Sequence, residues 1–166
     1  MTNSADQSWT HAGHGLPSSE PSLNTTAIAT GLQLPAGFAA IAGDPELGPA
    51  ITTNLARVEK KLREAIANSD PLADATSRHL VEAGGKRIRP LLTLLCAHLG
   101  DASRPAVVQA AVVVELTHLA TLYNDDVMDS ATMRRGAESA NARWDNSVAI
   151  LTGDYLFAHA SRLVAD

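Results

Sequence analysis

Cysteine is almost absent from this chain of 166 residues, because Cys96, in the apolar run LLTLLCAHLG, is the only one. A single thiol excludes a disulfide framework, and its apolar surroundings predict a small buried side chain in a reducing compartment. An excess of positive charge is also missing, since the net charge is -5 at pH 7. The chain therefore has no general attraction for nucleic acid or an anionic membrane, and any anion binding must come from local groups of cations.

Lysine and arginine are missing from the first 50 residues, which contain five of the eight prolines and six of the eleven glycines. Such a segment has little apolar surface to bury, so residues 1 to about 45 are predicted to be a disordered Gly/Pro-rich leader. Because it has no basic residues, it resembles neither a secretory signal nor a mitochondrial presequence. No stretch is expected to reach the length and apolarity of a membrane span, so a cytoplasmic location is expected.

Hydrophobic residues make up 45% of the chain, enough for one domain with a proper core. From Ile51 onward the apolar residues recur at spacings of three and four, and Pro, Gly-Gly or Gly interrupts the pattern. Helices are predicted over residues 51–66, 71–83, 90–100, 105–129 and 146–166. The third is apolar nearly all round, which predicts a buried helix, and Ser103 is the expected N-cap of the fourth. Neither a repeat nor a strand-like alternation is visible, so the predicted fold class is all-α.

An acidic cluster lies at the end of the fourth predicted helix, in the stretch LYNDDVMDSATMRRG. Asp125 and Asp129 are four residues apart and share one helix face, with Asp126 beside them. Like charges at this spacing repel, so a bound cation would stabilise them, and hard oxygen ligands suit Mg²⁺. His118 precedes Asp125 by two turns, about 10 Å along the axis, and faces the same way.

Two groups of cations accompany the aspartates. GGKRIRP places three cations within four residues, which predicts a compact anion site, beside two glycines that allow a ligand to approach the backbone. Arg134 and Arg135 follow the acidic cluster. Each feature also has an ordinary explanation: a solvated acidic helix end, a histidine in the core, a charged loop, and a helix break with incidental charges. Together these explanations require four coincidences in one short chain.

The order and spacing of GGKRIRP, ELTHLATLYNDDVMD and RRG resemble the trans-isoprenyl diphosphate synthases, the polyprenyl synthetase family, over about residues 50 to 166. The resemblance implies an all-helical isoprenoid-synthase bundle and head-to-tail condensation of isopentenyl diphosphate with an allylic diphosphate. It implies that Asp125 and Asp129, supported by Asp126, hold Mg²⁺ on the allylic diphosphate. The other implied ligands are Arg134 for the allylic diphosphate and, for isopentenyl diphosphate, Lys86, Arg89, His118 and Arg135.

The chain departs from the family pattern in two places. Asn124 stands where a histidine is common, with little expected effect, and the family's second aspartate-rich motif is not reached by Asp166. Residues 46–166 are therefore expected to form the N-terminal half of a synthase domain, inactive on its own and homodimeric when intact. In the family that the chain resembles, the side chains four and five positions before the first aspartate lie beneath the allylic site. Here they are the small Thr121 and Ala120, so the resemblance implies a medium or long polyprenyl product, released with peripheral contact to a membrane.

Three other functions are compatible with parts of this pattern. A non-catalytic partner subunit of a heteromeric synthase would keep the fold without turnover. A terpene cyclase or squalene-type synthase shares an aspartate-rich helix but is not expected to pair it with GGKRIRP and RRG. A surface acidic patch would bind no ligand at all.

Overall fold

The structure, a computed structural model, describes residues 36–165. Most of the leader predicted for residues 1 to about 45 thus lies outside the described residues, and its last part forms a 3-10 turn, Ala36–Phe38, and the short helix α1, Ala39–Ala42. The longer helices are α2 (Leu47–Ile66), α3 (Pro71–Glu82), α4 (Ile88–Ala97), α5 (Pro105–Met128) and α7 (Asn146–Ala165). A hairpin of β1 (Met133–Arg134) and β2 (Ala137–Glu138), followed by the short helix α6 (Ala140–Arg143), connects α5 to α7. The all-α prediction is confirmed.

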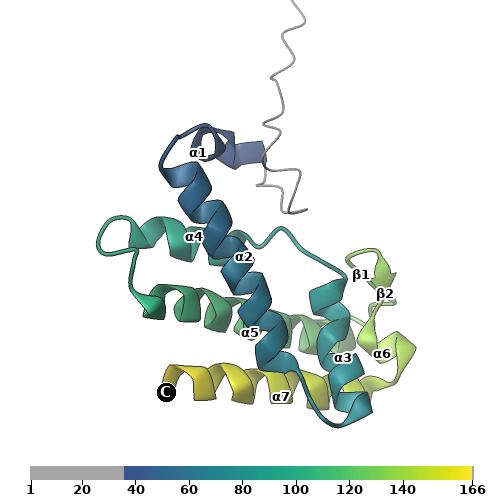
Figure 1. Ribbon diagram of the computed structural model, residues 1–166. Coiled ribbons are helices and arrows are strands. Elements are labelled where there is room, and N and C mark those ends of the chain that lie inside the picture. The colour runs from purple at the N-terminus through teal and green to yellow at the C-terminus, as the bar shows by residue number, and fades with distance from the viewer. Residues whose placement is uncertain (1–35, 166) are drawn as a thin grey trace, which may run out of the picture.

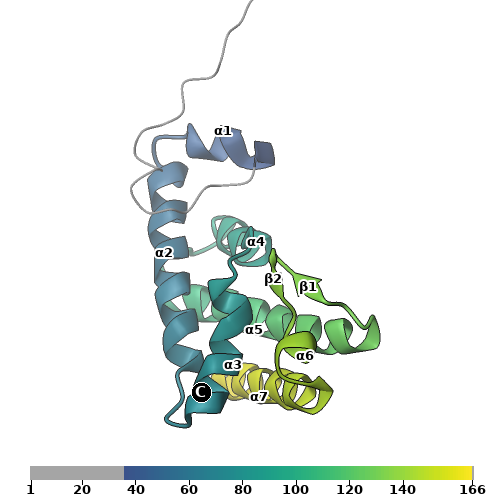
Figure 2. The same cartoon turned by 90° about the vertical axis from the view of Figure 1, so that its right-hand side faces the viewer.

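Helix α5 runs through the middle of the fold (Figures 1 and 2). It packs along α7 on one side and against α2 and α4 on others. Gly153 of α7 allows α7 to pack closely against α5, because it has no side chain. A Cβ at this position would lie 3.1 Å from the carbonyl oxygen of Ala120 and 3.2 Å from Oδ1 of Asn124. The buried residues of α5 thus form the centre of a core that also includes Ile51, Leu62, Leu80, Leu91 and Leu156.

The ends of α3 follow the predicted signals. Asp70 caps its start by accepting a hydrogen bond from the backbone N–H of Ala73 at 2.9 Å, and Pro71 occupies the first turn. The helix ends before Gly84 and Gly85, whose φ angles of +84° and +146° favour glycine. The positive φ angles of the two glycines therefore end the helix at this point.

Several details of α4 and α5 differ from the sequence predictions. α4 begins at Ile88, two residues before Pro90, and only one of its faces is buried. Cys96 is exposed, so the prediction of a buried thiol is wrong. The N-cap of α5 is Arg104 and not Ser103, whose hydroxyl instead bonds to Asp101 at 2.5 Å. A run of apolar residues thus marked these helices without revealing which face is covered.

The prediction that no stretch reaches the length and apolarity of a membrane span is also wrong. α5 is long and apolar enough to cross a bilayer, judged by length and composition alone. The core helix of a globular fold passes the same test, and in this structure α5 is the central helix against which α2, α4 and α7 pack. This packing accounts for the apolar residues on the buried faces of α5.

The hairpin after α5 was not expected from the sequence. Met133 pairs with Glu138 and Arg134 with Ala137 in antiparallel register. The two turn residues, Arg135 and Gly136, both have positive φ, 54° and 79°, the backbone that tight hairpins require.

Candidate active site

The three aspartates at the end of α5 have different surroundings. Asp125 and Asp129 are exposed, whereas Asp126 is fully buried. Arg134 donates to Oδ1 of Asp126 from Nε at 2.7 Å, and its Nη2 lies 2.5 Å from the same oxygen. Oδ2 of Asp126 is buried without a hydrogen-bond partner among the residues described. Two carboxylates thus face outward, and the third holds the first arginine of the hairpin.

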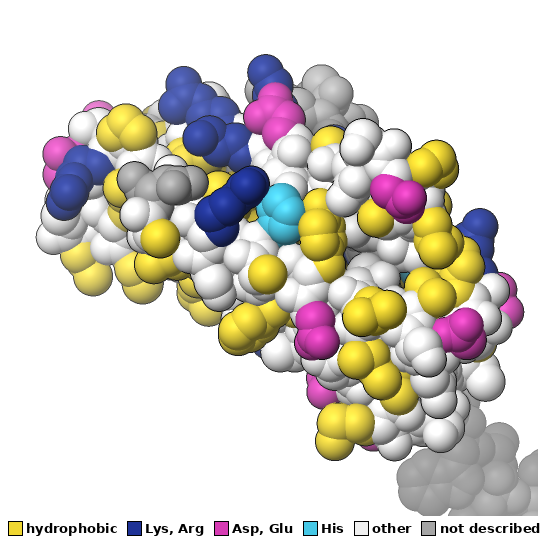
Figure 3. Space-filling view, turned by 90° about the horizontal axis from the view of Figure 1, so that it is seen from below, with side chains coloured by type: hydrophobic (Ala, Val, Ile, Leu, Met, Phe, Trp, Pro, Cys, Tyr) yellow, Lys and Arg dark blue, Asp and Glu magenta, His cyan; other side chains and the backbone are white. Residues whose placement is uncertain are grey.

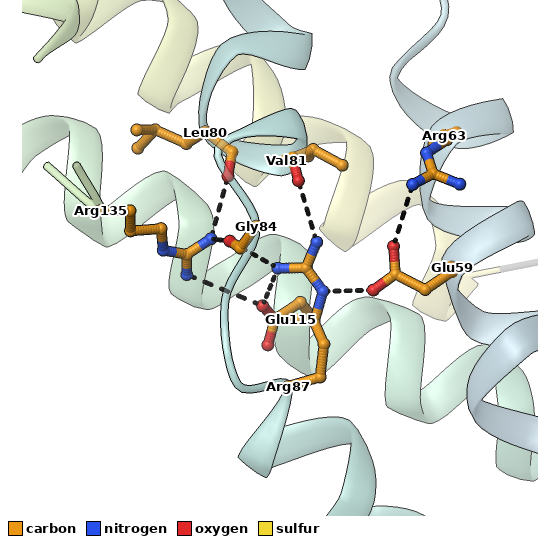
Figure 4. A network of polar contacts seen from close by, with 8 residues as sticks. All are labelled: Glu59, Arg63, Leu80, Val81, Gly84, Arg87, Glu115 and Arg135. Carbon is orange, nitrogen blue, oxygen red and sulfur yellow. Dashed lines mark hydrogen bonds and ion pairs between the residues drawn. The ribbon is translucent and has the colours of Figure 1, made fainter. Parts of the chain in front are cut away.

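Arg135 points back from the hairpin turn onto the glycine break (Figure 4). Its Nη1 donates to the carbonyl oxygen of Leu80 at 2.9 Å and to that of Gly84. The guanidinium covers Gly85 so closely that a Cβ at this position would lie 2.9 Å from Cζ of Arg135. Gly85 is therefore the residue that lets Arg135 lie flat on the loop.

The cations of GGKRIRP do not form one cluster. Lys86 and Arg89 are exposed, but Arg87 is buried and turns inward. Its Nη1 donates to Oε1 of Glu115 at 3.0 Å, and its Nε donates to Glu59 (Figure 4). The hypothesis that all three cations form a compact anion site is therefore wrong for Arg87.

Glu59 and Glu115, the two carboxylates that pair with Arg87, were not among the residues predicted from the sequence to matter for function. One signal for Glu115 was available, because it is the only charged residue in the apolar run AVVQAAVVVELTHL. Charged residues are almost never fully buried unless they are paired. A lone acid inside a long apolar helix therefore indicates a cationic partner, although the sequence does not say which one.

His118 connects the two groups of cations to the acidic cluster. Partial burial is the main cause that lowers its pKa below the ordinary value of 6.5, and the charges of Arg89, Arg135 and Arg134 lower it further. The carboxylate of Asp125 acts in the opposite direction. These charges act on one imidazole, so the structure brings together residues from the first turn of α4, from α5 and from the hairpin.

We expect His118 to titrate below pH 6.5 in the ligand-free chain and its pKa to rise when inorganic pyrophosphate binds, because a nearby anion favours the imidazolium. Since the folded-state pKa is lowered, the associated stability is fully present above the unfolded value and is lost as the pH falls through the folded pKa. Imidazole NMR signals followed from pH 8 to about pH 5 would measure this. His118→Gln should lessen the loss of melting temperature in acid, with His98→Gln, at an exposed position, as the control. A ligand-free pKa above 6.5 would contradict the assignment.

The acidic residues fit a divalent cation whose remaining coordination positions are filled by a bound ligand. Among residues 36–165, no three His, Cys, Asp or Glu side chains converge into a ready-made metal site. Asp125 and Asp129 offer exposed carboxylates one turn apart, whereas Asp126 beside them is buried and paired with Arg134. Mg²⁺ commonly takes one or two carboxylates together with water and phosphate oxygens. This donor set suits such an ion.

The chain is similar in sequence and in structure to known proteins of one family. Residues 70–166 match the family described as Polyprenyl synthetase. The chain is 52% identical over 124 residues to the nonaprenyl diphosphate synthase of Mycobacterium tuberculosis, covering 74% of this chain and 37% of that protein. It is 43% identical over 117 residues to heptaprenyl diphosphate synthase component 2 of Geobacillus stearothermophilus, covering 70% of this chain and 36% of that protein.

A solved geranylgeranyl pyrophosphate synthase from Corynebacterium glutamicum, complexed with calcium and isoprenyl diphosphate, shares 52% identity and a TM-score of 0.62, with 74% of this chain and 37% of that one covered. The chain spans little more than a third of the length of these relatives. The family match extends over more than half of the chain and includes the aspartates, the hairpin arginines and the glycine break. The chain belongs to the polyprenyl synthetase family.

Proposed function

We propose that this chain carries the diphosphate-binding part of a prenyltransferase, which joins isopentenyl diphosphate head-to-tail to an allylic diphosphate. The observation that carries the proposal is the meeting of two unlike groups at one end of α5. Exposed carboxylates of Asp125 and Asp129 lie on the helix, while the charges of Arg89, Arg134 and Arg135 act on His118 of the same helix. Metal-bridged and direct binding of two diphosphates requires these two kinds of group side by side.

The reaction needs stabilisation of negative charge more than it needs a nucleophile. Cleavage of the allylic C–O bond leaves a carbocation and pyrophosphate. The π electrons of isopentenyl diphosphate then form the new C–C bond, and the resulting cation loses a proton to the departing pyrophosphate. Arg134, fixed by Asp126, and Arg135, fixed by backbone carbonyls, present guanidinium groups whose planar geometry suits phosphate oxygens.

Asp125 and Asp129 would hold Mg²⁺, which when bound neutralises charge on the departing pyrophosphate. The buried Asp126 acts differently, because its Oδ1 is taken by Arg134. In this arrangement it supports the site by orienting a cation. The calcium in the Corynebacterium glutamicum relative supports a divalent ion in this family.

Calorimetric titration of the chain with isopentenyl diphosphate tests the proposal. Binding is expected for the wild type and is expected to be lost when the exposed cations Lys86 and Arg89 are both replaced by alanine. Replacing the exposed Lys60 and Lys61 of α2 in the same way gives a matched control. The absence of binding to the wild type would contradict the proposed function. Turnover is measured on a version extended with the remaining length of the Mycobacterium tuberculosis relative.

A partner subunit of a heteromeric synthase is the second candidate function. The Geobacillus stearothermophilus relative is named as component 2 of its synthase, which favours an assembly of more than one chain. The face seen from below in Figure 1, the side on which α7 lies, exposes many hydrophobic side chains (Figure 3). The exposed large hydrophobic residues of α7 are Ile150, Leu151, Phe157 and Val164. Sedimentation of the purified chain distinguishes a self-associating homodimer, which we expect, from a monomer that awaits a different partner.

We also propose a product longer than farnesyl diphosphate, by family resemblance at positions 120 and 121. Ala120 is buried with its carbonyl against Gly153, whereas Thr121 is exposed and its hydroxyl donates to the carbonyl of His118 at 2.8 Å. An aromatic at 121 can therefore block a growing tail without disturbing the contact between α5 and α7. Thr121→Phe is expected to shorten the radiolabelled products of the extended enzyme, with Thr121→Ser as the control. Unchanged chain length in the Phe variant would contradict the assignment.

A further inference from the structure

Arg87 is the one cation of GGKRIRP that has no access to a ligand, yet it makes the most contacts. The residue is 7% exposed and its backbone is left-handed, with φ of 47°. Besides the two glutamates, its guanidinium donates to the carbonyl oxygens of Val81 at 3.1 Å and Gly84 at 3.3 Å. A strained backbone that turns a charged side chain inward persists only when surrounding contacts fix it.

Arg87 and Arg135 share two acceptors (Figure 4). The carbonyl oxygen of Gly84 accepts from both guanidinium groups. Oε1 of Glu115 lies 3.0 Å from Nη1 of Arg87 and 4.0 Å from Nη2 of Arg135. Since Arg135 also lies flat on Gly85, its position depends on the same loop that Arg87 fixes from the other side.

The charges of this network do not cancel. Three guanidinium groups, those of Arg63, Arg87 and Arg135, face the two carboxylates of Glu59 and Glu115, which leaves one positive charge in excess. Glu59 pairs with Arg63 and Arg87. Among the residues described, Glu115 is the one carboxylate that pairs with Arg135, and its Oε1 lies closer to Arg87 than to Arg135. The uncompensated charge is therefore at the Arg135 end, beside the exposed loop cations.

We propose that Arg87 is a positioning residue for the diphosphate site. Through Gly84 and Glu115 it fixes the glycine loop and the guanidinium of Arg135, and it withdraws most of the negative charge of Glu115 from Arg135. Arg135 is then held in place but left electrostatically available to an anion. This inference rests on the proposed function for the identity of the anion, isopentenyl diphosphate.

The test compares Arg87→Lys with Arg63→Lys by calorimetric titration with isopentenyl diphosphate. Lysine keeps the charge but cannot span Glu59, Glu115 and the two carbonyls at once. We expect roughly tenfold weaker binding for Arg87→Lys, the size that follows from losing one charge-assisted hydrogen bond at the site. Arg63 also pairs with Glu59, at 3.7 Å, but is exposed and touches neither Gly84 nor Glu115. Arg63→Lys is expected to bind as the wild type does.

A spectroscopic arm separates positioning from general destabilisation. The side-chain N–H signals of Arg135, assigned by Arg135→Lys, are recorded well below the melting temperature of each variant. In Arg87→Lys they are expected to shift and exchange faster with water, while the signal of Arg134 stays unchanged because Asp126 holds it. If Arg87→Lys does not fold, Glu59→Gln, which keeps an oxygen acceptor for Arg87, is expected to show the same change to a smaller degree.

The two arms distinguish the inference from the proposed function. A wild type that binds no isopentenyl diphosphate would overturn the function, while the signals of Arg135 would still report whether Arg87 positions it. Wild-type affinity together with unchanged signals of Arg135 in the folded Arg87→Lys variant would overturn the inference.

Discussion

Replacing Asp125 with alanine is expected to abolish the Mg²⁺-dependent binding of an allylic diphosphate to this chain. The loss of turnover in the extended enzyme should be about a hundredfold to a thousandfold, the range found when one preorganised electrostatic contact is removed from an active site. Binding of isopentenyl diphosphate should persist, because Asp125 is not among its proposed ligands. The measurement is calorimetric titration with each diphosphate, with and without Mg²⁺.

The stability of the same variant separates a ligand from a structural residue. Asp125 and Asp129 are exposed like charges one turn apart, so removing one relieves repulsion in the ligand-free helix. The melting temperature of Asp125→Ala should therefore not fall. Asp126→Ala should lower it, because the buried carboxylate pairs with Arg134. Asp154→Ala, at an exposed acid of α7, is the control for the change of net charge. Retained Mg²⁺ dependence in Asp125→Ala would remove the metal assignment.

The sequence was informative about helices and weak about the direction of side chains. Spacing located α2, α3 and α5 well, since apolar period and the stops at Pro71 and Gly84 are local signals. The three cations of GGKRIRP looked equivalent in the sequence. Arg87 is distinguished from its neighbours by two carboxylates, Glu59 and Glu115, each 28 residues away along the chain. Contacts over such separations depend on how the helices pack, and periodicity does not specify that.

The aspartates show the same limit at one helix end. Helical spacing placed Asp125 and Asp129 on a shared face and Asp126 beside them, and the structure agrees. The burial of Asp126 and its pairing with Arg134 depend on the hairpin, whose left-handed turn residue Arg135 carries no local signal for that conformation. Non-glycine residues with positive φ are uncommon, so a sequence pattern seldom predicts them. The role of each aspartate therefore follows from the hairpin rather than from the motif.

Glu115→Ala is expected to produce the largest loss of stability of any single change in this network. Glu115 is 2% exposed and faces Arg87, which is 7% exposed, so its removal leaves a buried guanidinium with only Glu59 as a charged partner. Breaking a buried pair in this way costs about 3–5 kcal/mol of unfolding free energy. Urea unfolding measures it. Glu64→Ala, which breaks an exposed pair with Lys60, should cause no measurable change.

Replacing the whole buried network should give the opposite result for stability. In Glu59→Leu/Arg87→Met/Glu115→Leu no buried charge is left unpaired at these three positions, and such apolar replacements are often neutral or stabilising. We therefore expect this triple variant to recover most of the stability that Glu115→Ala loses. We expect the triple variant to bind isopentenyl diphosphate more weakly than the wild type does, because Arg135 then has only carbonyl acceptors to hold it. If the triple variant regains stability but binds isopentenyl diphosphate more weakly than the wild type does, the network is retained for the position of Arg135. If the triple variant regains stability and also binds isopentenyl diphosphate as the wild type does, the buried charges serve the fold alone.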